Sequence, residues 1–406
     1  MVRDLLAGAG RHDLVETAVL LVSEIVTNAL LHAGTPIDVS ATVDGRGLRV
    51  EVGDGSLHLP TRRRYAPTAG TGRGMLMLER MVDDWGVSRR RDGKTVWFEL
   101  SGAEMDRGAG PVHGTTDGRA SRGPTISVRF KNMPLLLHVA WQEHAQTLLR
   151  EYLLARLDTD EDVDPIRTHA EATDAIAVLG EHVPRPRIGM RPHEVMADAT
   201  EPLVTASVVD VPVPLDSVPN FQVLDEAIEA AIRLSGEGMV LTPQPQPEVQ
   251  EFRRWLCRQV AVQASGGAAG RWSVREALLP GPATALEWDK ASVSASARPV
   301  IAADQANRIL AVSPALLELL GYDDARELVN RRVVTVIPQR YRQAHVAGFT
   351  LHLLVGRRPL LDQTVHVPAL RRDGSEVQVE MTVRSEPAGE GRQVFVAVME
   401  PVGEAD

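Results

Sequence analysis

The chain has 406 residues, of which 44% are hydrophobic and 24% charged, and its formal net charge is −10. Such a length predicts two or three domains, since single cores stop growing at about 250–300 residues. The acidic balance and the 4% aromatic content argue against a general nucleic-acid binder. One cysteine excludes an internal disulfide framework, and no apolar run reaches the roughly 18 residues of a membrane span. No secretory signal stands at the start, so we expect a cytoplasmic protein.

Composition and periodicity divide the chain into three domains and predict the α+β class. Residues 1–102 have the pattern of a compact unit with one strongly apolar helix and short alternating strands. Residues 103–125 are rich in Gly, Ser, Thr and charges without a period, which predicts a flexible linker. Residues 126–280 carry helical periodicity and predict a mainly helical transmitter or dimerisation domain. The pattern of residues 285–402 predicts strands on both sides of short helices.

Polar residues follow one stripe of the first long helix. In the segment LLVSEIVTNALLHAG, Glu24, Asn28 and His32 stand at i, i+4 and i+8, beside apolar neighbours. A carboxylate and a carboxamide next to a core are costly unless something uses them. The pattern therefore indicates a functional stripe, although an ordinary solvated helix face is the alternative.

Three turns follow this helix. The strand LRVEV ends in a glycine turn at Asp54, which can present a carboxylate to an amine-bearing ring. In AGTGRGM, alternating glycines precede an amphipathic helix, and such glycines let the backbone approach phosphate oxygens at a helix N-terminus. The segment DGKTVWFEL predicts a hairpin. Each segment also has an ordinary structural interpretation when it is considered alone. The first would be a plain turn, the second a loop that serves packing, and the third a hairpin.

The order of these phrases is more specific than any one of them. E-x-x-x-N-x-x-x-H, then D-G-S, G-x-G-x-G-M and G-K-T resemble the GHKL ATPase superfamily, and within it the anti-sigma-factor serine kinases. The resemblance covers about residues 3–100. It implies a Bergerat-type α/β sandwich, with a mixed sheet under helices and a nucleotide held beneath a lid.

The resemblance also implies roles for individual residues, with ATP and Mg²⁺ as the ligands. Glu24 would be the catalytic base that orients an attacking hydroxyl. Asn28 would coordinate Mg²⁺. Asp54 would accept a hydrogen bond from the adenine amine, with Thr95 supporting it through water. The remaining ATP contacts would come from Gly55, Gly70, Gly72, Arg73, Gly74 and Met75.

Departures from the family pattern shape the expected activity. Ser56 stands after Gly55, and the chain opens almost at its first helix, so we expect the family's leading strand to be absent or the start to be truncated. No helix pair with a phospho-accepting histidine stands upstream, which disfavours a histidine kinase. The resemblance implies transfer to a serine or threonine of a partner with an anti-anti-sigma fold, and a sigma factor as a second partner.

A second resemblance covers about residues 293–402. The phrases NRILAVSPA, LGY and RRDGSEVQVE, in this order, resemble PAS domains. Ser313 before Pro314 is a good N-cap, and Gly321 predicts a helix end. The resemblance implies a small curved antiparallel sheet with helices over one face and a ligand or partner in the hollow.

The ligand of this PAS-like domain is open. No cysteine follows Cys257, which excludes the cysteinyl adduct of flavin photoreceptors. The phrase PQRYRQAH is similar to that of haem-binding PAS domains and would make His345 an axial ligand. A packing role for this histidine is the alternative, because an apolar residue near Val365 replaces the distal arginine of those sensors.

Residues 126–280 match no catalytic motif, and their amphipathic helices indicate a bundle or a homodimer seam. The whole sequence predicts an ATP-dependent protein-serine kinase, or anti-sigma switch, controlled by a PAS sensor, without direct contact to nucleic acid or membrane. Two alternatives stay open. One is an ATP-dependent switch that binds its partner without turnover, and the other is a PAS scaffold with a decayed ATP site.

Overall fold

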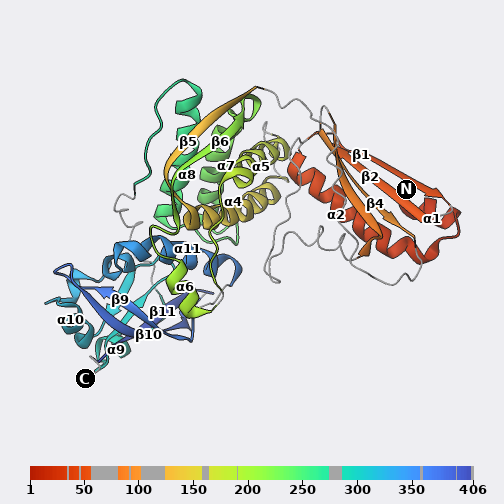
Figure 1. The fold of residues 1–406 in the computed structure, drawn as a ribbon. Helices are drawn as coiled ribbons and strands as arrows, with labels where there is room; N and C mark the ends of the chain where they lie inside the picture. Colours follow the sequence, from red (N-terminus) through yellow and green to blue (C-terminus); the bar gives the residue numbers. More distant parts are fainter. Residues whose placement is uncertain are drawn as a thin grey trace.

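The computed structural model has a mixed helix and sheet architecture, as the sequence predicts. It describes residues 1–33, 36–44, 47–55, 81–90, 93–101, 124–157, 164–189, 191–273, 286–356, 360–389 and 391–403. Three bodies follow one another along the chain (Figure 1). Within the described part of the chain, no helix is both long and apolar enough to cross a membrane.

The N-terminal domain is a sheet with helices on one face. Its elements are α1 (Val2–Gly8), η1 (His12–Leu14), α2 (Val15–Ala33), β1 (Asp38–Asp44), β2 (Gly47–Asp54), β3 (Asp84–Arg90) and β4 (Gly93–Leu100). The strand order is β1-β2-β4-β3, and every neighbouring pair is antiparallel. The expected mixed sheet is therefore not found among the described strands.

Sequence periods explain how α2 lies on this sheet. Its buried residues Ala18, Leu21, Ile25 and Ala29 recur every three or four positions, which places them on one stripe. On the sheet, alternate residues of β2 and β4 form buried cross-strand pairs, and these pairs are Leu48 with Leu100, Val50 with Phe98, and Val52 with Val96. The helix stripe and this column of pairs share one hydrophobic core.

The middle domain combines helices with two long strands. Its elements are β5 (Thr125–Pro134), α4 (Leu135–Arg156), α5 (Pro165–His182), α6 (Pro192–Asp198), β6 (Thr205–Pro214), η2 (Leu215–Ser217), α7 (Asn220–Gly236) and α8 (Pro247–Ala264). The antiparallel β5–β6 ribbon was not anticipated from the sequence. Proline has no N–H to donate to a neighbouring strand. Pro212 and Pro214 are tolerated in β6 because this strand pairs with β5 on one edge only, and an N–H on its other edge has no strand to bond.

The C-terminal domain is a five-stranded antiparallel sheet of order β8-β7-β11-β10-β9. Its elements are α9 (Lys290–Ser294), β7 (Val300–Ala303), β8 (Ile309–Val312), α10 (Pro314–Leu320), η3 (Ala325–Glu327), η4 (Val333–Val336), α11 (Gln339–Val355), β9 (Thr364–Leu370), β10 (Glu376–Pro387) and β11 (Gln393–Pro401). The predicted cap is present, since Ser313 Oγ accepts a hydrogen bond from the Leu316 N–H at 3.2 Å. The predicted helix end is also present, with Gly321 in the left-handed region at φ 72°.

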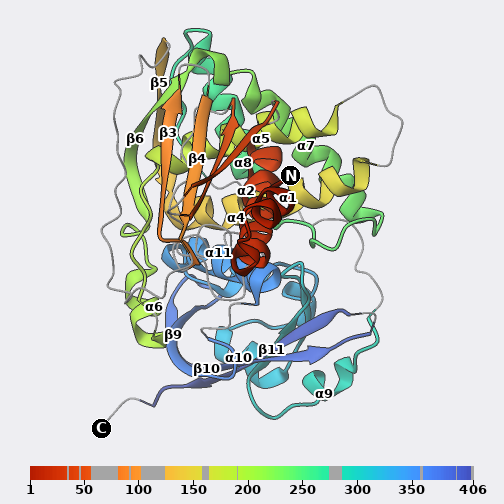
Figure 2. The ribbon, with the colours of Figure 1, turned by 90° about the vertical axis from the view of Figure 1, so that its right-hand side faces the viewer.

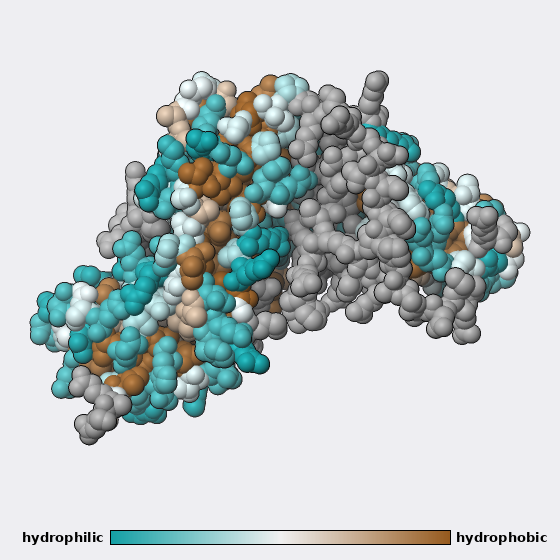
Figure 3. Space-filling view, viewed as in Figure 1, coloured by the Kyte–Doolittle hydropathy of each residue, from teal (hydrophilic) through white to brown (hydrophobic). Residues whose placement is uncertain are grey.

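Two helix contacts join the three domains. The helix α11 packs against α4 and lies between the middle domain and the C-terminal sheet (Figure 2). On the other side of the middle domain, α5 packs against α2. On the face shown in Figure 3, apolar residues are spread in small groups among hydrophilic ones over the middle and C-terminal domains.

Candidate functional site

The predicted adenine contact, Asp54, ends β2 on the sheet face that α2 covers. It lies opposite Lys94 of β4, and Lys94 Nζ is 3.1 Å from Asp54 Oδ1. The side chains of Asp54 and Lys94 are only 1% and 8% exposed. This ion pair continues the column of apolar cross-strand pairs, directly after Val52 and Val96. The hydrophobic core thus ends in one buried carboxylate and one buried ammonium group.

The charge state of this pair follows from its surroundings. Burial lowers the pKa of Lys94, while the carboxylates of Asp54 and of Asp174 in α5 oppose that shift. A buried carboxylate has to be hydrogen-bonded or paired, because its desolvation is costly. A carboxylate also has two oxygens and about four acceptor positions, so it can accept an N–H from a base as well.

Thr95 does not lie beside the Asp54 carboxylate. It pairs with Gly53, so it lies on the opposite face of the sheet from Asp54 and Lys94. A Cβ placed on Gly53 would be 3.6 Å from Thr95 Oγ1. The expected support of Asp54 by Thr95 through water therefore does not fit this register. Lys94, which the sequence interpretation left without a role, occupies that place.

The two other predicted residues lie on α2. Glu24 directly precedes the buried Ile25 and is half-buried, whereas Asn28 precedes the buried Ala29 and is exposed. Both side chains therefore flank the stripe that packs on the sheet, as their spacing predicts. The helix α2 covers the sheet face that ends in Asp54 and Lys94. Glu24 and Asn28 therefore lie on the helix that covers the same face as the buried pair.

The rest of the predicted ATP site is only partly described. Gly55 follows Asp54 at the surface, and Gly70, Gly72, Arg73, Gly74 and Met75 lie outside the described residues. Within the described ranges, no group of three or more His, Cys, Asp or Glu side chains could hold a metal ion. Mg²⁺ bound with a nucleotide needs only one or two protein ligands beside phosphate and water, so the exposed Asn28 fits that role.

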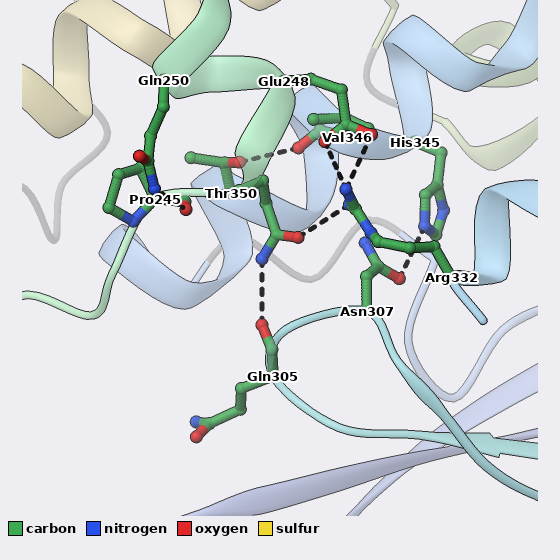
Figure 4. A network of polar contacts seen from close by, with 10 residues as sticks. Pro245, Glu248, Gln250, Gln305, Asn307, Arg332, His345, Val346 and Thr350 are labelled. Atoms are coloured by element: carbon green, nitrogen blue, oxygen red, sulfur yellow. Dashed lines mark hydrogen bonds and ion pairs between the residues drawn. The ribbon is translucent and has the colours of Figure 1, made fainter. Parts of the chain in front are cut away.

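The predicted haem ligand, His345, is packed between the C-terminal and middle domains. Its Nε2 lies 2.9 Å from Asn307 Oδ1 (Figure 4). Its ring also stacks on Phe349 at a centroid distance of 6.1 Å. Burial and the nearby Arg332 charge lower the pKa of His345 to about 4. Ligation of iron through Nε2 would require this nitrogen to give up its hydrogen bond to Asn307. The geometry therefore favours the packing role.

A polar network beside His345 ties the C-terminal domain to α8. Arg332 donates to Glu248, and its Nη2 lies 3.0 Å from Gln246 Oε1 (Figure 4). The Gln246 amide in turn donates to the carbonyl oxygen of Gln305 at 3.0 Å. No motif pointed to these residues, because they lie up to 86 positions apart in the sequence.

Comparisons with known proteins agree with the two domain assignments. Residues 4–100 match the family model described as histidine kinase-like ATPase domain, and residues 290–402 match that of the PAS fold. A protein of Azorhizobium caulinodans, described as uncharacterized, is 32% identical over 115 residues, which are 28% of this chain and 16% of that protein. This chain therefore spans only a small part of the length of that relative.

Solved structures similar to the chain include PAS domains and LOV proteins. The PAS domain of an HTR-like protein from Haloarcula marismortui is 23% identical, with a TM-score of 0.23, over 28% of this chain and 88% of that one. A LOV protein of Rhodobacter sphaeroides is 15% identical, with a TM-score of 0.24, over 28% and 66%. The two family models, and not these structures, show that the chain carries an N-terminal ATPase domain of GHKL type and a C-terminal PAS domain.

Proposed function

We propose that this chain, with its histidine kinase-like ATPase and PAS domains, is a cytoplasmic protein-serine kinase of the anti-sigma switch type. Its substrate would be a serine of a small partner with an anti-anti-sigma fold, and a sigma factor would be a second partner. The PAS domain would supply the control. We propose no direct contact with nucleic acid or membrane, and a homodimer through the helical or PAS domain is compatible with this function.

One observation carries the proposal. Asp54 is a fully buried carboxylate at the end of a strand, under the helix that carries Glu24 and Asn28. A buried acid at the edge of a core has little structural benefit, since an apolar pair would serve the same packing at lower desolvation cost. An acceptor for the amine of a purine base gives it a use.

The chemistry assigned to each residue is simple. The serine oxygen forms a bond to the γ-phosphorus of ATP, the bond from that phosphorus to the bridging oxygen breaks, and ADP leaves. Glu24 accepts the proton of the serine hydroxyl. Mg²⁺, held in part by Asn28, would neutralise phosphate charge when bound. Asp54 fixes the base, which keeps the phosphates in place relative to α2.

The first test is calorimetric titration of the full chain with MgATP. Asp54→Asn removes the charge and keeps the size, and it should reduce ATP affinity at least tenfold. Asp84→Asn is the matched control, because Asp84 is an exposed acid at the far end of the same sheet. If the wild type binds no ATP, the kinase is excluded and a PAS scaffold remains.

The second test separates a kinase from a binding switch. Candidate anti-anti-sigma-fold proteins are incubated with the chain and γ-labelled ATP, and phosphoserine is located by mass spectrometry. Glu24→Gln should lower transfer by about 10²- to 10⁴-fold and leave ATP affinity unchanged. Glu16→Gln, in the exposed first turn of the same helix, is the control. ATP-dependent partner binding without transfer in the wild type would support the non-catalytic switch instead.

A further inference from the structure

We propose that the helix α11 transmits the state of the PAS domain to the middle domain, and that Gln343 is the positioning residue that makes the connection. Gln343 belongs to the PAS domain, yet it caps the first turn of α4 in the middle domain. This inference deepens the PAS control of the proposed function and rests on that function for what is finally controlled. Its test uses no nucleotide, so the two proposals can fail separately.

Neighbouring residues of α11 contact different domains. Val346 is 2% exposed and belongs to the hydrophobic core of the middle domain. His345, directly before it, bonds to Asn307 of the PAS domain (Figure 4). One turn later, the Phe349 ring meets that of Phe395 in β11 edge to face, at a centroid distance of 4.9 Å. The helix α11 therefore has one face in each domain.

The first turn of α4 takes its hydrogen-bond acceptors from outside the helix. The first N–H groups of any α-helix have no partner within it, and Pro134 at the N-cap has no side-chain acceptor. The Leu135 N–H donates to the Val204 carbonyl at 2.9 Å. The Leu136 N–H donates to Gln343 Oε1 at 3.0 Å. The start of a 22-residue helix of the middle domain thus depends on a side chain of the PAS domain.

The Gln343 amide also holds the segment that leads into β6. Its Nε2 donates to Glu201 Oε1 at 3.1 Å and to Thr205 Oγ1 at 3.0 Å. The Glu201 N–H in turn donates to the Arg340 carbonyl of α11 at 3.0 Å. Because one amide makes bonds to both places, a displacement of α11 acts on the start of α4 and on the start of β6 together.

Movement of α11 is the step that would carry the state of the PAS domain. A ligand that enters between α11 and the sheet would separate the Phe349 and Phe395 rings and shift α11 toward α4. A helix shift of about 1–2 Å is enough to break a hydrogen bond such as that from Leu136 to Gln343. The helix α4 packs against α5, and α5 packs against α2, the helix of the proposed ATP site.

The experiment is hydrogen–deuterium exchange of the full chain, measured by mass spectrometry at the first turn of α4. Phe395→Leu weakens the ring contact that holds α11 on the sheet and substitutes for a ligand. Val394→Ala is the matched control, because Val394 is fully buried in the separate cluster on the opposite face of β11. We expect Phe395→Leu to speed exchange at the start of α4 about five- to tenfold, and Val394→Ala to change it less than about twofold.

A second pair of variants tests Gln343 itself. Gln343→Leu keeps the approximate size but cannot accept the Leu136 N–H, so it should speed exchange at the start of α4 about five- to tenfold. Gln339→Leu is the matched control, because Gln339 is exposed at the start of the same helix. In the Gln343→Leu background, Phe395→Leu should add no further change, since the connection is already broken.

Each outcome decides for or against the connection. Unchanged exchange in Phe395→Leu, or an equal change in Val394→Ala, would overturn transmission through α11. A full effect of Phe395→Leu in the Gln343→Leu background would overturn the role of Gln343. Circular dichroism checks that each variant is folded, and Phe349→Leu, on the other side of the same contact, replaces Phe395→Leu if that variant is not. Absence of ATP binding in the wild type would overturn the kinase and leave this result unaffected.

Discussion

Arg332 and Glu248 form a buried ion pair that joins the PAS domain to the middle domain. Arg332 Nη1 lies 2.8 Å from Oε1 and 2.7 Å from Oε2 of Glu248, and the two side chains are only 6% and 9% exposed. Because Glu248 is in the first turn of α8 and Arg332 precedes η4, the pair fixes one end of a helix against a sensor loop. The contact is therefore a specific docking point between the domains.

Glu248→Ala should weaken the contact between the PAS domain and the middle domain and lower the free energy of unfolding. It leaves the Arg332 guanidinium buried without its carboxylate, so we expect a loss of about 3–5 kcal/mol in the free energy of unfolding. Urea unfolding measures it. Glu376→Ala is the control, because the Arg340–Glu376 pair is 42% and 32% exposed and should contribute no more than about 1 kcal/mol. Equal small losses in both variants would contradict this assignment.

Acid should destabilise the fold between about pH 6.5 and pH 4. Burial lowers the pKa of His144 and of His345 to about 4 from the usual 6.5. Below pH 6.5 the unfolded chain binds protons that the folded chain does not, so stability falls as pH falls through this window. Each of the two histidines should lower the free energy of unfolding by roughly 2 kcal/mol at pH 5.

His345→Gln checks the contribution of one histidine. Glutamine can still hydrogen-bond to Asn307, but it does not titrate, so the difference in unfolding free energy between pH 7 and pH 5 should shrink by roughly 2 kcal/mol. Chemical denaturation at the two pH values gives this difference directly. An unchanged pH dependence would show that His345 is not held neutral by the fold.

The Asp54–Lys94 pair predicts that removing both charges costs less stability than removing Asp54 alone. Asp54→Ala leaves Lys94 buried and unpaired, and should cost about 3 kcal/mol or more of unfolding free energy. The double variant Asp54→Ala with Lys94→Met removes both charges and should recover part of that loss. Denaturant unfolding followed by circular dichroism is the measurement. A double variant as unstable as the sum of the single ones would mean that the two residues do not interact.

Two glycines should respond oppositely to alanine. A Cβ at Gly93 would overlap the backbone carbonyl of Asp54, so Gly93→Ala should cost about 1–3 kcal/mol and disturb ATP binding. Gly348 is exposed within α11 and has nothing within 4 Å of the added Cβ, so Gly348→Ala should stabilise the protein by about 0.5–1 kcal/mol. The melting temperatures of the two variants are compared with that of the wild type. A lower melting temperature for Gly348→Ala would contradict the open space around Gly348.

Several parts of the fold and site could be predicted from local pattern. The i, i+4 spacing placed Glu24 and Asn28 on one helix stripe, and the Ser313–Pro314 pair marked a helix start, as the structure shows. The β5–β6 ribbon could not be predicted in this way, since its strands are separated by the whole of α4, α5 and α6. The order of phrases identified the ATPase and PAS domains, and the comparisons agree.

The sequence by itself determined the domain order, the helix stripe and the strand that ends in Asp54, because each is encoded in consecutive residues with a fixed period. Only the tertiary structure decided that Lys94 and not Thr95 faces Asp54, because neighbouring strand residues point to opposite faces and the choice depends on register. It also decided that Arg332 meets Glu248 and that Gln343 meets the start of α4. These contacts depend on how separate helices pack, and no local pattern contains that information.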